Sequence, residues 1–125
     1  MKKKHRMTET EQQGAVFLAK ADQLLSAAEQ AQDGTSVYEN CRAAVHNLLL
    51  AYLVAHGESE PAGADLTSAH LWEKCVARNP EIRALVPNVR LFLNDSGFVT
   101  TEEEVETMLD AANELWDFIF ALIYG

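Results

Sequence analysis

Cysteine and basic residues are both scarce in this chain of 125 residues. The two cysteines, Cys41 and Cys75, are widely separated, so the sequence contains neither a disulfide framework nor a Cys-x-x-Cys metal motif. Four of the ten Lys and Arg residues lie within residues 1–7, which leaves six against nineteen Asp and Glu in residues 7–125, a net charge of −13. Because phosphate backbones are bound by clustered cations, this acidic body argues against binding of nucleic acid.

Motifs for cofactors and metals are also missing. The sequence has no glycine-rich phosphate-binding loop, no dinucleotide-binding fingerprint and no Gly-x-Ser-x-Gly nucleophile turn. It has no Glu-x-x-His pair of the kind that binds two irons in helical bundles. The histidines share no ligand spacing with each other or with the cysteines; they are His5, His46, His56 and His70. We therefore expect no metal and no cofactor.

Long apolar runs are absent as well. The most apolar stretch, residues 48–55, is far shorter than the roughly 20 residues that cross a bilayer. The basic residues near the start are followed by the polar sequence TETE rather than by an apolar segment, which is not typical of a secretory signal. We expect residues 1–7 to be a disordered basic tail and residues 8–125 to form a single domain. The expected location is the cytoplasm, without contact with a membrane.

The main pattern that the sequence does contain is helical periodicity. Apolar residues recur at three-and-four spacing over about residues 10–32 and 36–57 and again after Thr100, whereas strand alternation and hairpin turns are absent. Gly34 separates the first two helices, and Ser36 with Glu39 fits a capping box that starts the second. In the last helix one apolar stripe is predicted to pack along the bundle; it comprises Val105, Met108, Leu109, Ala112, Leu115, Trp116, Ile119, Phe120 and Ile123.

Shorter elements are predicted between these long helices. Residues 58–64 read as a loop, after which Asp65 or Thr67 caps a helix that runs through residues 70–76. A further helical segment follows Pro80, and we expect a break in it at Pro87. Together the elements predict an all-α fold, an up-and-down bundle of about five helices.

The helix predicted over residues 36–57 is apolar on nearly every side in its second half. Arg42 and His46 form a polar side over the first turns, and Leu50 and Leu53 continue that side as apolar residues. A helix with two apolar sides needs a second packing surface, either from its own chain or from another subunit. We predict a homodimer whose interface includes Leu50 and Leu53.

Arg42 and His46 are also the candidate catalytic residues. They lie four positions apart and are therefore neighbours on one helix face, with Glu39 one turn away. An imidazole can move protons, a guanidinium can bind a phosphate and a carboxylate can orient the imidazole. The alternative is purely structural: Glu39 pairs with Arg42 within the helix, and His46 makes a polar contact as the helix enters the core.

The order of the predicted elements resembles the HEPN domain, the higher eukaryote and prokaryote nucleotide-binding fold. The resemblance covers residues 17–123 and is carried by the segments AAVHNLLLAYLVAHG, SAHLWEKC and TTEEEVETMLDAANELWDFIF. It implies a helical bundle that dimerises and works beside a small nucleotidyltransferase. Our first functional hypothesis is accordingly a non-catalytic HEPN-like interaction module.

Two alternatives follow from the catalytic and nucleotide-binding members of that family. Its ribonucleases carry an Arg and a His at a wider spacing than the three residues that separate Arg42 from His46. The corresponding hypothesis is a metal-independent RNase toxin of a toxin–antitoxin pair that uses these two residues. Members associated with nucleotidyltransferases carry a basic turn before the last helix, where this chain has Asn94 and Asp95 near Arg90. The corresponding hypothesis is a nucleotide-binding regulator that uses these three residues.

Overall fold

The computed structural model describes residues 9–56, 67–85, 92 and 102–124. These residues form five α-helices and no strand, so the predicted all-α fold is confirmed for the part of the chain that is described. The predicted tail of residues 1–7, the loop of residues 58–64 and the break at Pro87 lie outside the described residues. The helices are α1 (Glu9–Gln30), α2 (Gly34–Ala55), α4 (Ser68–Arg78), α5 (Glu81–Leu85) and α6 (Glu102–Tyr124).

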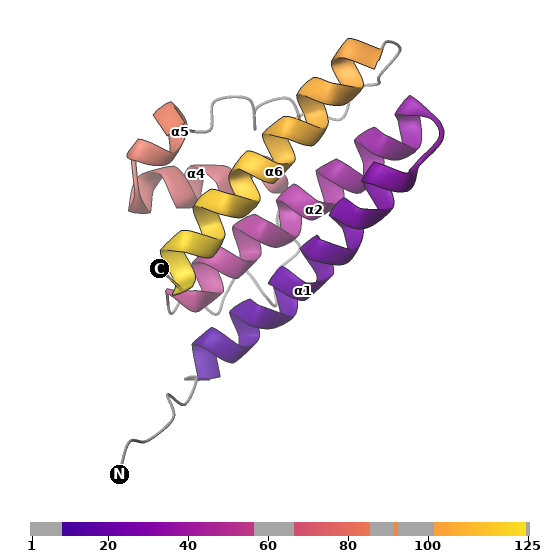
Figure 1. Ribbon diagram of the computed structural model, residues 1–125. Coiled ribbons are helices and arrows are strands. Elements are labelled where there is room, and N and C mark those ends of the chain that lie inside the picture. Colours follow the sequence, from indigo (N-terminus) through magenta and orange to yellow (C-terminus); the bar gives the residue numbers. More distant parts are fainter. Residues whose placement is uncertain (1–8, 57–66, 86–91, 93–101, 125) are drawn as a thin grey trace.

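A tight turn joins α1 to α2, and the two helices lie antiparallel (Figure 1). The start of α2 differs from the predicted capping box, because Asp33 rather than Ser36 is the N-cap residue. Its extended backbone (φ −123°, ψ 152°) precedes the helix, and its carboxylate accepts a hydrogen bond of 3.0 Å from the backbone N–H of Ser36. The Ser36 hydroxyl donates a second bond of 2.8 Å to the same carboxylate. Asp33 therefore satisfies a backbone donor that the first turn leaves unpaired.

The three long helices do not alternate in direction as an up-and-down bundle would. Gln32 of the α1–α2 turn and Gly34 at the start of α2 line the same small cleft as Val105 and Glu106 of α6, so α6 begins beside that turn. From there α6 runs in the same direction as α2 (Figure 1). The periodicity of each helix fixes which side is apolar, but it does not fix the direction in which the helix crosses the bundle.

Helix α2 is the centre of the core and packs against α1, α4 and α6. This position explains why its second half is apolar on nearly every side. Leu53 is fully buried and Leu50 is 9% exposed within the single chain. The predicted dimer interface through Leu50 and Leu53 is therefore corrected by the structure. The second packing surface that the sequence calls for comes from the same chain, so these two side chains give no reason for a second copy.

Helix α4 lies alongside α2, and residues later in α4 contact residues later in α2. His46 contacts Ser68, and at the far ends the Arg78 guanidinium donates a hydrogen bond of 2.9 Å to the carbonyl of His56. Between them the Cys75 thiol lies 3.8 Å from the carbonyl oxygen of Leu49. The two helices consequently run in the same sense, and the first turn of α4 is placed beside the polar first half of α2. None of the described helices is long and apolar enough to span a membrane.

Candidate functional site

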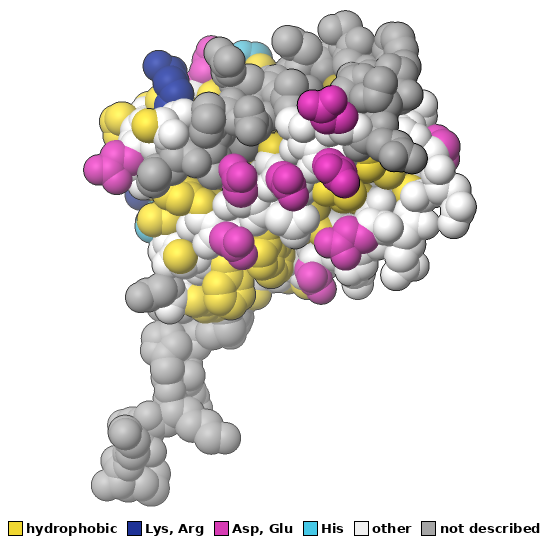
Figure 2. Space-filling model, turned by 45° about the horizontal axis from the view of Figure 1, so that its top comes forward, with side chains coloured by type: hydrophobic (Ala, Val, Ile, Leu, Met, Phe, Trp, Pro, Cys, Tyr) yellow, Lys and Arg dark blue, Asp and Glu magenta, His cyan; other side chains and the backbone are white. Residues whose placement is uncertain are grey.

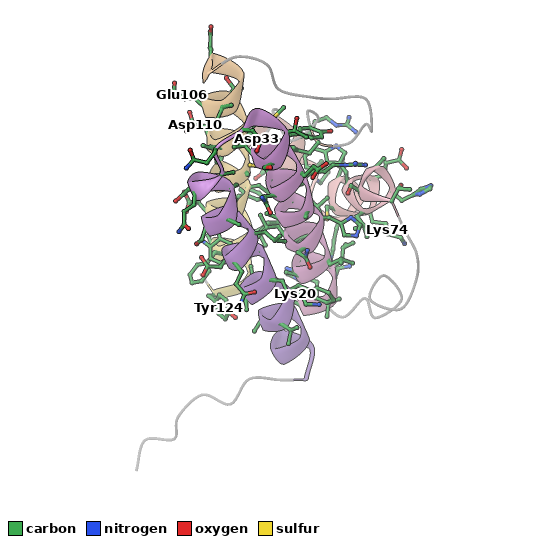
Figure 3. All side chains as sticks on the ribbon, turned by 90° about the vertical axis from the view of Figure 1, so that its right-hand side faces the viewer. Lys20, Asp33, Lys74, Glu106, Asp110 and Tyr124 are labelled. Carbon is green, nitrogen blue, oxygen red and sulfur yellow. The ribbon has the colours of Figure 1, made fainter. Side chains whose placement is uncertain are left out.

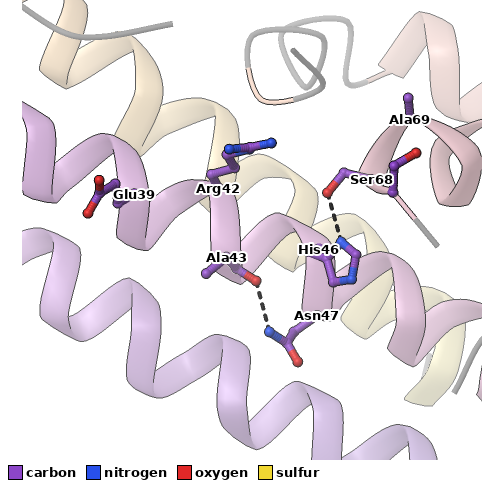
Figure 4. Close-up of a pocket in the computed structure, with 8 residues that line it drawn as sticks. Glu39, Arg42, Ala43, His46, Asn47, Ser68 and Ala69 are labelled. Carbon is purple, nitrogen blue, oxygen red and sulfur yellow. Dashed lines mark hydrogen bonds between the residues drawn. The ribbon is translucent and has the colours of Figure 1, made fainter. Parts of the chain in front are cut away.

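An open pocket lies between the polar side of α2 and the first turn of α4 (Figure 4). Its volume is about 690 Å³. Both predicted catalytic residues, Arg42 and His46, line it. Glu39, the carboxylate that could orient the imidazole, lines it as well. The lining residues are Glu39, Arg42, Ala43, His46 and Asn47 of α2, with Thr67, Ser68 and Ala69 at the start of α4.

The first turn of α4 is fixed by Thr67, one of the two caps that the sequence predicts. Thr67 has an extended backbone, and its hydroxyl accepts a hydrogen bond of 3.2 Å from the backbone N–H of His70. The same hydroxyl lies 3.0 Å from Nδ1 of the His70 ring. The N–H groups of the first helical turn have no acceptor within the helix, and they give this end of α4 a partial positive charge. Ser68 and Ala69 bring that end of the helix to the pocket.

A hydrogen bond of 2.8 Å between His46 Nδ1 and Ser68 Oγ joins the two walls of the pocket. His46 is half-buried. Burial lowers the pKa of its imidazole, and the nearby Arg42 guanidinium lowers this pKa further. His46 is therefore neutral at physiological pH, with one ring nitrogen as a donor and the other as an acceptor. Sequence spacing could not connect Ser68 with Arg42 and His46, because Ser68 lies on another helix.

The positive charge of the pocket comes from Arg42, whose half-buried side chain lies one turn before His46. Glu39 lies one turn earlier still and is exposed. Asn47 stands beside His46 and donates a hydrogen bond of 2.9 Å to the Ala43 carbonyl (Figure 4). The pocket thus combines a cation, a neutral imidazole, a hydroxyl and the positive end of a helix with the exposed carboxylate of Glu39. These groups suit a small ligand that carries a phosphate or carboxylate group.

Two further predictions concern ligands and metals. Arg90, Asn94 and Asp95, the predicted nucleotide-binding residues, lie outside the described residues. Among the residues that are described, no group of three or more His, Cys, Asp or Glu side chains is arranged to hold a metal ion.

A second surface feature, an apolar groove, lies between α1 and α6 and was not predicted from the sequence. Its volume is about 350 Å³, and it is lined by Leu18, Ala19, Asp22, Trp116, Phe120 and Tyr124. Predicting Phe120 as a core residue was wrong, because its side chain is 45% exposed. Leu115 and Ile119 are fully buried. Trp116 and Phe120 each follow one of them and therefore point about 100° further around the helix.

Comparison with known protein families, curated proteins and solved structures finds no match to this chain. The resemblance to the HEPN domain therefore stays a prediction. The case for a function consequently depends on the pocket and the groove themselves.

Proposed function

We propose that this chain is a non-catalytic HEPN-like binding module whose α2–α4 pocket takes a small ligand with a phosphate or carboxylate group. The observation that supports this proposal is the convergence of Arg42 and the first turn of α4 on one open pocket. A guanidinium can bind an anionic group through two hydrogen bonds, and the first-turn N–H groups of a helix add further donors. The bond between His46 and Ser68 holds the two helices in place around the ligand.

The same pocket favours binding over catalysis. Cleavage of RNA by general acid–base chemistry needs one group that takes a proton and another that gives one. Among the described lining residues His46 is the one imidazole, and its Nδ1 already bonds to the Ser68 hydroxyl. Glu39 also lines the pocket, but its side chain is exposed.

Calorimetric titration with inorganic phosphate and with ATP, at low salt where screening is weakest, tests the pocket. We expect saturable binding that Arg42→Ala weakens by about tenfold or more, because a hydrogen bond to a charged group contributes about 1.5–3 kcal/mol. Lys20→Ala removes a cation from the exposed surface of α1 and is the matched control, which should leave binding unchanged. Equal losses in both variants, or no saturable binding by the wild type, would contradict the proposal.

The nucleotide-binding regulator is separated from this proposal by the same titration. If ATP binding is lost in Arg90→Ala and kept in Arg42→Ala, the site is at Arg90, Asn94 and Asp95 rather than between α2 and α4. Loss in Arg42→Ala alone places the ligand in the α2–α4 pocket.

A metal-independent RNase toxin is the second candidate, and the lowered pKa of His46 favours it. A neutral imidazole beside a guanidinium can accept a proton while the cation stabilises developing negative charge. We nevertheless expect no RNA cleavage in the presence of a metal chelator and no toxicity on expression. Cleavage that disappears in both Arg42→Ala and His46→Ala, with unfolding temperatures unchanged, would make the RNase the better assignment.

The HEPN resemblance extends the proposal to partners. It implies a homodimer and a role beside a small nucleotidyltransferase. Sedimentation velocity at micromolar concentration tests the homodimer. Co-purification with the product of an adjacent nucleotidyltransferase gene tests the second partner, and the absence of such a gene would count against it.

A further inference from the structure

Three aromatic side chains of α6 form a continuous band along the α1–α6 groove. The ring centroids of Trp116 and Phe120 are 5.8 Å apart with an interplanar angle of 28°, and those of Phe120 and Tyr124 are 4.8 Å apart at 48°. Phe120 is 45% exposed and Tyr124 is 43% exposed. The buried side chain of Leu18 also lines the groove. The band from Trp116 to Tyr124 spans about 12 Å of helix axis, a little more than two turns.

The border of this groove is acidic. Asp22 lines it, and Asp117, which directly follows the groove residue Trp116 on α6, is exposed. Helix α6 contains no Lys or Arg. Figure 2 shows acidic side chains lying between apolar patches, with the few Lys and Arg side chains of this view at its left and upper left. A partner that covers the aromatic band would therefore place its own border residues against carboxylates.

Lys20 is the one cation of α1, and its side chain does not line the groove. Its ammonium lies 5.7 Å from the centroid of the Phe17 ring. On the helix it points roughly 150° away from the mean direction of the groove residues Leu18, Ala19 and Asp22. Figure 3 agrees, since it places Lys20 and Tyr124 on opposite sides of α1.

We infer that the α1–α6 groove binds an amphipathic helix of a partner protein whose apolar side is bordered by Lys and Arg. Helices dock in grooves through apolar anchors at spacings of three and four, and a band of two turns accommodates two or three such anchors. Opposite charges at the border select the partner and speed its association. A second copy of this chain fits less well, because a two-fold interface would bring Asp22 and Asp117 close to the same acidic border of the other copy. This site is separate from the α2–α4 pocket.

Fluorescence anisotropy with a labelled peptide tests the inference on the full chain. The probe is an amphipathic Leu/Lys peptide of about 18 residues, or five helical turns. One comparison peptide has the same composition in a scrambled order, and another has Glu in place of Lys. We expect saturable binding of the Leu/Lys peptide, binding of the scrambled peptide that is about tenfold weaker and no binding of the Leu/Glu peptide.

Variants of the protein locate the peptide. Phe120→Ala should weaken the binding of the Leu/Lys peptide by about tenfold, as truncation of a central aromatic anchor does. Asp117→Asn should weaken it by a few fold and reduce its dependence on salt. Val16→Ala is the matched control, because Val16 is 55% exposed but does not line the groove. Thermal unfolding of each variant establishes that it is folded. We expect both variants to fold, because the side chains of Phe120 and Asp117 are exposed.

Several outcomes would overturn the inference. Equal binding of the amphipathic and scrambled peptides would show attraction by net charge alone. Unchanged binding in Phe120→Ala would place the peptide elsewhere. Binding of the Leu/Glu peptide as tight as that of the Leu/Lys peptide would contradict the charge argument. Self-association in sedimentation that Phe120→Ala abolishes would identify a second copy of this chain as the occupant.

Discussion

Gly14 of α1 lies directly against Ala55 at the end of α2. A Cβ atom added to Gly14 would lie 3.1 Å from the Cβ of Ala55 and 3.2 Å from the carbonyl oxygen of Ala51. Both distances are shorter than ordinary van der Waals contact. Because Gly14 has no side chain, α1 and α2 approach closely here. This contact lies at the opposite end of the helix pair from the turn that contains Asp33.

Gly14→Val should destabilise the protein by about 1–3 kcal/mol, because the larger side chain forces the two helices apart. Gly14→Ala should change stability much less, since a gain in helix propensity of about 1 kcal/mol offsets the closer contact. Urea unfolding followed by circular dichroism measures both. Ala55→Gly in the Gly14→Ala background removes the nearer Cβ, so the steric part of the effect should shrink. A Gly14→Val variant as stable as the wild type would contradict the close approach.

Leu53→Ala tests whether this side chain belongs to the core or to a dimer interface. Because Leu53 is fully buried within one chain, we expect a loss of about 2–5 kcal/mol in the free energy of unfolding. The exposed Val16→Ala should change it by less than about 0.5 kcal/mol. Sedimentation of Leu53→Ala at a concentration where it is folded should match that of the wild type. Dissociation of a dimer with unchanged monomer stability would instead restore the interface predicted from the sequence.

The thiol of Cys41 should resist alkylation in the folded protein. Cys41 is fully buried, and burial together with the charge of Glu29 raises the pKa of its thiol from 9.0 to about 11. A raised folded-state pKa gives stability that is complete below the unfolded value of 9.0 and is lost as the pH rises toward 11. Iodoacetamide labelling followed by mass spectrometry should show modification only after unfolding. The stability of Cys41→Ala should fall less over the same interval, and a parallel fall would show that another group is responsible.

Because of Asp33, the stability of the protein should depend on pH in the acidic range. The hydrogen bonds from the Ser36 hydroxyl and backbone N–H lower the pKa of its carboxyl below 3.8. A lowered folded-state pKa gives stability that is present above the unfolded value and is lost as the pH falls through the folded one. Asp33→Ala should therefore lower the unfolding temperature near neutral pH, and this difference should shrink below 3.8. Asp33→Asn is the matched control, because an amide can cap the helix without titrating.

Local rules account for most of the secondary structure. Three-and-four periodicity located the three long helices to within about two residues, the usual uncertainty of helix ends. The prediction of Thr67 as one of two possible caps and of a helix after Pro80 is confirmed. The start of α2 was missed, because Ser36 with Glu39 fits a capping box as well as Asp33 with Ser36 fits a simple cap. Sequence spacing alone does not decide between them.

The sequence by itself determined that Arg42 and His46 are neighbours, because residues four apart on a helix share a face. It likewise determined that the second half of α2 must be covered on all sides. Only the tertiary structure decided that α4 supplies Ser68 to the pocket, because a contact across 22 positions depends on how separate helices pack. The tertiary structure also decided that the chain itself covers Leu53 and that Phe120 remains exposed. Periodicity identifies an apolar side of a helix, but burial depends on which other element packs against that side.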